Sequence, residues 1–179
     1  TLCLKAEVES SDRLVRRLYL DTQNRLPGLG EYYSAKDMIG KGQYERLVDK
    51  LLKTDEFRSN LATKIVDHYA PKRKEREQHP LVYRSLEKHI KETYVKPDLD
   101  FRQFIRDMLS ADGISARNQM VLFFTGKEDS KMMAGRFTEN IWGITLACAE
   151  CHDHKYYPEL THKNFWSMAT FFEGMDKRY

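Results

Sequence analysis

The chain has 179 residues, a length that suits one domain, and its composition is that of a globular protein: 41% apolar, 12% aromatic and 32% charged. Its 30 basic and 27 acidic side chains nearly balance, which gives no indication of nucleic-acid binding. No apolar run approaches the roughly eighteen residues of a membrane span, so we expect no transmembrane segment.

The N-terminal stretch TLCLKAEVESSD lacks the basic, apolar and small-residue zones of a signal peptide. The chain begins with Thr1 and not with Met, and removal of an export signal is one ordinary explanation for such a start. An extracytoplasmic location therefore stays open. Cys3 lies in this stretch, either as a free thiol or as a link to a partner chain.

Apolar residues recur at three- and four-residue spacing along most of the chain, which predicts α-helices and no strands. Ser10, Ser11 and Asp12 are candidates to cap the first helix. Residues 23–34 contain one proline and two glycines and are predicted to form a loop. Residues 70–80 are the most polar segment, and we expect a surface loop or a mobile connection there.

In the second half of the chain, Asp98 or Asp100 is expected to cap a helix that stops near Gly113, and residues 114–124 show no clear pattern. A long helix over residues 128–152 is expected to end in a cluster of cysteines and histidines. The sequence predicts one irregular all-α domain of about six to eight helices over residues 1–179. Helices are predicted over residues 12–22, 44–53, 57–69, 81–94, 100–110, 128–152 and 162–175.

The cluster in that long helix contains two cysteines and two histidines within seven residues, and its CAECH run matches C-x-x-C-H, the attachment pattern of c-type haem. Two thiols three residues apart on a helical turn can each add across a vinyl group on one porphyrin edge, and the next residue then lies beneath the iron. Residues 143–158 are therefore predicted to attach one covalent haem c. Cys148 and Cys151 would hold the porphyrin, and His152 would be the proximal iron ligand.

Two other interpretations of the cluster stay open. A structural zinc site usually takes its ligands from two separated elements, whereas these four side chains are almost contiguous. A redox dithiol favours a βα setting that this helical pattern lacks. A chain stabilised by zinc or by a disulfide would be an interaction module, with its densely charged helices as the functional surface.

The sixth position of the iron separates two functions. A second protein ligand suits electron transfer, and an open position suits a haem enzyme or a gas sensor. His154 is only two residues past His152, so we expect it to lie around the site, with Asp153 and Lys155, and not on the opposite face of the haem. The distal candidates are His68, His162 and Met133, with Met132 and Met168 as rivals, and His79 and His89 are expected on the surface.

Several blocks along nearly the whole chain resemble the planctomycete-type cytochrome c-associated domain, a family of exported bacterial domains of unknown function. The N-terminal block is Arg16, Arg17, Leu18, Tyr19, Leu20 and Asp21, followed by Leu26 and Pro27. YERLVDKLL at 44–52 is a near-literal match, and the middle blocks contain Tyr83, Arg84, Phe101 and Phe104. The signature block is similar at Gly143, Thr145, Cys148, Cys151, His152, Asp153, His154, Lys155 and Pro158.

The resemblance implies an exported, mostly helical domain with a haem-attachment motif. It favours an electron carrier over a catalyst, in a periplasmic or otherwise extracytoplasmic location. The expected partners are redox proteins, other cytochrome subunits among them, and a neighbouring subunit could supply the sixth iron ligand.

Overall fold

The computed structural model describes residues 10–70, 73–96, 100–124 and 129–174, and within these ranges the chain is helical and contains no strand. The all-α prediction is confirmed. The described residues form nine α-helices and two short 3₁₀ helices, more than the six to eight expected. None of the helices described is long and apolar enough to cross a membrane. Cys3 and Asp98 lie outside the described residues.

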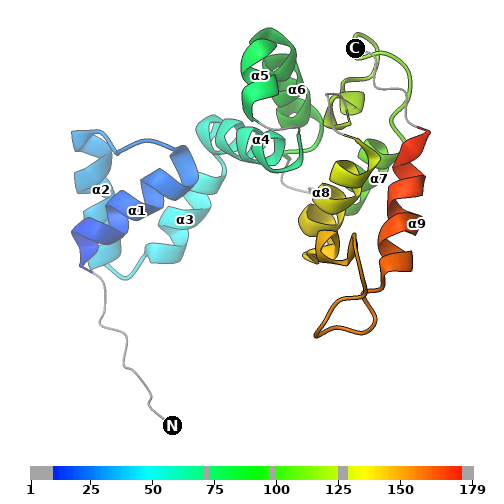
Figure 1. The fold of residues 1–179 in the computed structure, drawn as a ribbon. Helices are drawn as coiled ribbons and strands as arrows, with labels where there is room; N and C mark the ends of the chain where they lie inside the picture. Colours follow the sequence, from blue (N-terminus) through cyan, green and yellow to red (C-terminus); the bar gives the residue numbers. More distant parts are fainter. Residues whose placement is uncertain (1–9, 71–72, 97–99, 125–128, 175–179) are drawn as a thin grey trace. The chain divides into compact units, whose positions relative to one another are not determined.

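The chain divides into two compact units, Thr1–Lys64 with Glu87–Leu99, and Ile65–Leu86 with Asp100–Tyr179. Each unit is built from its own apolar clusters, and the single domain over residues 1–179 stays a prediction. The first unit contains α1 (Ser11–Gln23), α2 (Leu29–Gly40), α3 (Tyr44–Leu52), the start of α4 (Asp55–Tyr69) and the end of α6 (Pro80–Thr93), as Figure 1 shows. Its core joins α1, α2 and α3 through Val15, Leu18, Tyr19, Ala35, Leu47 and Leu51.

The helix α2 was not expected, because residues 23–34 were predicted to be a loop. The structure ends that loop at Gly28, where the Glu31 carboxylate accepts a hydrogen bond from the Gly28 amide at 2.8 Å. The same carboxylate pairs with the Arg25 guanidinium through two contacts of 2.7 Å. A glutamate three residues after a capping position is a helix start signal, and here it outweighs the neighbouring glycines.

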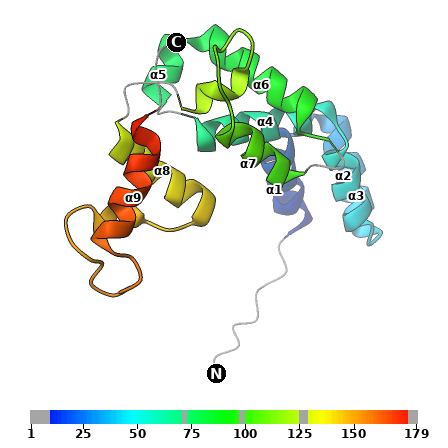
Figure 2. The same cartoon turned by 90° about the vertical axis from the view of Figure 1, so that its right-hand side faces the viewer.

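The second unit contains the rest of α4, α5 (Arg73–Gln78), the start of α6, α7 (Phe101–Leu109), the 3₁₀ helix η1 (Gln119–Phe123), α8 (Ser130–Trp142), the 3₁₀ helix η2 (Leu146–Ala149) and α9 (His162–Glu173). Helices α8 and α9 lie side by side in both Figure 1 and Figure 2. A loop without helix links η2 to α9. Met133 and Ala134 of α8 pack against Ala169 and Phe172 of α9.

Two boundaries in this unit differ from the sequence-based expectations. Residues 73–78 form the short helix α5, although the 70–80 segment was expected to be a loop. Helix α7 spans Phe101–Leu109, close to the predicted 100–110, but Gly113, expected as its stop, lies four residues beyond its end with a φ of 86°. The cap at the start of α7 is confirmed as Asp100, whose carboxylate accepts hydrogen bonds from the amides of Arg102 and Gln103.

Candidate functional site

The cysteine cluster does not lie in a long helix, which corrects the prediction for residues 128–152. Helix α8 ends at Trp142, because Gly143 adopts the left-handed conformation at a φ of 66° and a ψ of 24°. Its amide donates back to the Glu139 carbonyl at 3.1 Å, which closes the helix end. Three residues after Gly143 the chain forms the 3₁₀ turn η2 (Leu146–Ala149), and this turn carries the first cysteine of the motif, Cys148.

One side of the turn η2 packs against α9, and its other side is exposed to solvent. Leu146 and Ala149 are buried and pack against Phe165 of α9. Cys148 and Cys151 are both exposed, and both are free thiols. Because residues three apart share one face of a 3₁₀ turn, the apolar pair lies underneath and Cys148 faces outward. The two thiols are therefore accessible to a large reagent.

Glu150, between the two cysteines, is anchored from both sides. Its carboxylate pairs with Lys131 of α8 at 2.8 Å, and this contact raises the pKa of the lysine. Its carbonyl accepts a hydrogen bond of 3.2 Å from the Trp166 indole of α9. These contacts tie the turn to both helices, and sequence reasoning missed Lys131 and Glu150, because no local spacing pairs residues 19 positions apart.

His152 is exposed, and its Nδ1 lies 2.7 Å from the carbonyl oxygen of Asp153. A carbonyl oxygen can only accept, so Nδ1 carries the proton and donates. The proton on Nδ1 leaves Nε2 with a lone pair, and no contact within the described residues occupies it. Histidines that bind metals commonly hold the other ring nitrogen in this way.

The other two histidines near the turn have their lone pairs engaged. The Nδ1 of His154 accepts hydrogen bonds from the amides of Tyr156 and Tyr157, at 3.1 and 3.2 Å. The Nε2 of His162 accepts one from the Trp166 indole at 2.8 Å, since an indole N–H can only donate. Both rings act as acceptors that hold the connection between η2 and α9, and Trp166 takes part in this framework.

Asp153 and Lys155 differ in what they contact. The Asp153 carboxylate accepts a 2.7 Å hydrogen bond from the His162 amide at the start of α9, so it positions the loop. The His154 amide donates to the Leu160 carbonyl at 2.9 Å, which closes the same loop. Lys155 lies over the Tyr156 ring, 5.4 Å from its centroid.

The distal candidates are distributed over three elements. His68 is an exposed residue near the end of α4, and its carbonyl accepts a hydrogen bond from Asn140 of α8 at 2.6 Å. Met133 is 2% exposed in the cluster between α8 and α9, where it fills the core. Of its rivals, Met132 is exposed at the start of α8, and Met168 is half-buried against the same clusters. Neither Met133 nor His162 is presented to the cysteine turn with an unoccupied donor atom.

The groups suggested by the sequence make different demands on the side chains around the turn. Within the described ranges, no three histidine, cysteine or acidic side chains gather as a metal-binding group, and the two thiols are not joined. Covalent haem requires two accessible thiols and one imidazole with a ring nitrogen left for the iron. Cys148, Cys151 and His152 supply these three features.

The family comparison gives a match over almost the whole length of the chain. The model of the family PSCyt2, described as a protein of unknown function (DUF1549), matches residues 3–177. Neither a comparison with curated proteins nor one with solved structures found a match. Because this match covers residues 3–177 of a chain of 179 residues, the chain belongs to the PSCyt2 family.

Proposed function

We propose that this chain is a c-type cytochrome domain that holds one covalent haem c through Cys148 and Cys151 and acts in electron transfer. The observation that carries the proposal is the 2.7 Å contact between His152 Nδ1 and the Asp153 carbonyl, which directs the lone pair of this histidine to Nε2. A haem held there would supply one-electron redox chemistry.

The residues of the turn have separate tasks in this proposal. The thiols of Cys148 and Cys151 would hold the haem, each through a carbon–sulfur bond made by addition across a vinyl group, with the thiol hydrogen going to the other vinyl carbon. His152 would offer Nε2 to the iron, while its Nδ1–H donates to the Asp153 carbonyl. Leu146 and Ala149, packed on Phe165, keep the turn in place beneath these bonds.

The same proposal extends to location and partners. The resemblance to exported domains supports a periplasmic or otherwise extracytoplasmic site of action. Exposure of both cysteines and of His152 leaves this side of the chain open to another protein. We propose redox proteins as partners, including other cytochrome subunits.

The test is expression of the full chain in a host with cytochrome c maturation, followed by intact mass and a reduced spectrum in alkaline pyridine. We expect the added mass of one haem and the α-band of haem c. Cys148→Ala and Cys151→Ala should each lose one thioether bond, and the double variant should lose the haem. His162→Ala is the matched control and should keep it. A wild-type chain without added mass would refute the proposal.

A second candidate is a haem enzyme or sensor with an open sixth position on the iron. The support for it is that His154 and His162 both use a ring nitrogen as a hydrogen-bond acceptor, and that Met133 is held in the core. Carbon monoxide distinguishes the two candidates. An immediate shift of the ferrous spectrum favours the open iron, and an unreactive low-spin spectrum favours the electron carrier.

A further inference from the structure

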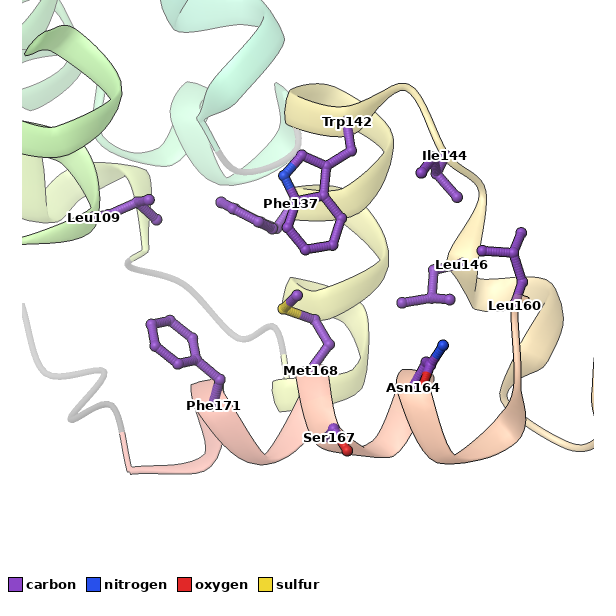
Figure 3. A pocket seen from close by; sticks show the side chains of 10 residues that line it. All are labelled: Leu109, Phe137, Trp142, Ile144, Leu146, Leu160, Asn164, Ser167, Met168 and Phe171. Atoms are coloured by element: carbon purple, nitrogen blue, oxygen red, sulfur yellow. The ribbon is translucent and has the colours of Figure 1, made fainter. Parts of the chain in front are cut away.

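A cavity of about 560 Å³ lies in the second unit, beside the cysteine turn but not lined by any residue of the CAECH motif. Its walls come from α8, from α9 and from the chain between them, with one residue from the end of α7 (Figure 3). This volume falls in the range of small-molecule sites. The lining residues are Leu109, Phe137, Trp142, Ile144, Leu146, Leu160, Asn164, Ser167, Met168 and Phe171.

None of these ten lining residues is charged. A charged group in such a cavity would lose its hydration without gaining an ion pair, which costs several kcal/mol per ion. The cavity therefore selects against ionic ligands. The lining differs in this respect from the rest of the chain, of which 32% is charged.

The aromatic rings and the polar atoms of the lining narrow the class of ligand further. Phe137 and Trp142 form an edge-to-face pair with ring centroids 5.5 Å apart, and Met168 rises from α9 toward them in Figure 3. Aromatic walls of this kind favour flat rings. The lining holds three polar side chains, Trp142, Asn164 and Ser167. Asn164 donates to the Glu159 carbonyl at 2.8 Å, whereas the Trp142 indole N–H and the Ser167 hydroxyl have no hydrogen-bond partner within the described residues, so either can donate to a ligand oxygen.

We infer that this cavity, hereafter the α8/α9 pocket, binds a neutral, flat ring compound that carries a carbonyl group. The inference does not depend on the haem, because the pocket contains neither the thiols nor His152. Trp142 and Phe171 are 53% and 65% exposed at its rim, so a ligand can enter without a rearrangement of the core.

The probe for the test is dimethylnaphthoquinone, in which methyl groups occupy both ring carbons next to the carbonyls and prevent addition of the cysteine thiols. The chain has two tryptophans, Trp142 in the pocket and Trp166 outside its lining. We expect saturable quenching of tryptophan fluorescence by the quinone. The quenching should persist in Trp166→Phe, where Trp142 is the remaining indole, and should fall at least about threefold in amplitude in Trp142→Phe.

Two ligand analogues test the chemistry of the site by competition. Dimethylnaphthalene keeps the rings without the carbonyls and should relieve the quenching by the quinone only at concentrations well above that of the quinone. Naphthalene sulfonate keeps the rings and adds a charge, and it should not compete. Competition by the sulfonate that equals that of the neutral compounds would overturn the inferred ligand class.

Phe171→Asp places a charge at the exposed rim and should weaken quinone binding at least about tenfold, which is about 1.4 kcal/mol. Leu81→Asp is the matched control, because Leu81 is a still more exposed apolar residue outside the lining, at the start of α6. It should leave binding unchanged. Equal loss in both variants, or none in either, would overturn the inference.

The full chain and its Cys148→Ser/Cys151→Ser variant are titrated in parallel. Because that variant carries no thioether-linked haem, failure of haem attachment and failure of quinone binding are read separately.

Sedimentation at several protein concentrations provides the last check. If Phe171→Asp dissolves a dimer and the quinone does not bind, the rim is a contact between two copies and the ligand site is refuted.

Discussion

The left-handed ending of α8 can be tested by placing an alanine at Gly143. At a φ of 66° a residue with a Cβ is strained by roughly 1–2 kcal/mol. Part of this is offset by about 0.4–1 kcal/mol, because alanine lowers the conformational entropy of the unfolded chain. The net expectation for Gly143→Ala is a loss of about 1 kcal/mol in the free energy of unfolding.

Gly174 provides a matched control in the same unit. It follows α9 as Gly143 follows α8, but its φ is −81°, which any residue adopts. A Cβ would meet no other atom within 4 Å at either glycine, so the two substitutions differ in backbone conformation and not in crowding. Gly174→Ala should be neutral or slightly stabilising. Gly143→Asn should recover part of the loss, since Asn24 adopts a φ of 55° at the end of α1.

The measurement is urea unfolding followed by tryptophan fluorescence, which reports on the second unit because Trp142 and Trp166 both lie there. A loss of about 1 kcal/mol also lowers the midpoint of thermal unfolding by roughly 2–4 °C. If Gly143→Ala proves as stable as Gly174→Ala, the helix does not end at Trp142. The long helix that the sequence pattern predicts would then run on into the cysteine motif.

Four further predictions concern stability, core packing and the turn. The contacts of Glu31 with Arg25 and the Gly28 amide lower its pKa from 4.5 to about 2, so their stabilisation is present above pH 4.5 and is lost as the pH falls toward 2. Because Glu31 is 41% exposed, Glu31→Gln should cost only about 1 kcal/mol at pH 7 and nothing near pH 2, measured by urea unfolding across this pH range. Asn60→Ala should cost about 2 kcal/mol in the same assay, because its buried amide donates to the carbonyls of Asp21 and Thr22, and a loss below half of this would contradict that role. Met133→Ala should cost about 3 kcal/mol through the cavity it leaves, while the spectrum of any attached haem stays unchanged, and a spectral change would make Met133 an iron ligand after all. Cys148→Ser/Cys151→Ser should leave the stability of the haem-free chain within about 0.5 kcal/mol, since both thiols are exposed, and calorimetry would expose any larger structural role.

Much of the fold could be predicted from apolar spacing, since strongly periodic segments such as 11–23 and 44–52 form helices at nearly the expected bounds. The misses have local causes. Gly28 and Glu31 together start α2, but the glycines nearby were given more weight. At Gly143 the apolar spacing continues to Cys148 although the helix ends, so spacing alone does not show the end of α8.

The chemistry of the site was only partly visible in the sequence. The spacing identifies Cys148, Cys151 and His152, but it does not say which ring nitrogen of a histidine carries a proton. That assignment depends on contacts with Asp153, with two tyrosine amides and with Trp166, and these arise from the folded loop. The α8/α9 pocket is likewise formed by residues from four separate elements and has no sequence signature.

The prediction about the thiols does not depend on the helix that was predicted to carry them. In an α-helix, residues three apart lie on nearly the same side, and in a 3₁₀ turn they coincide. Within η2, Leu146 and Ala149 therefore lie inside and Cys148 lies on the outer side, and Cys151, which follows the turn, is exposed as well. What the change of turn alters is the next residue, because the chain bends after Ala149 and His152 meets the Asp153 carbonyl instead of continuing a helical ladder. The outward position of Cys148 thus follows from the turn, whereas the exposure of Cys151 and the orientation of the histidine depend on the folded chain after it.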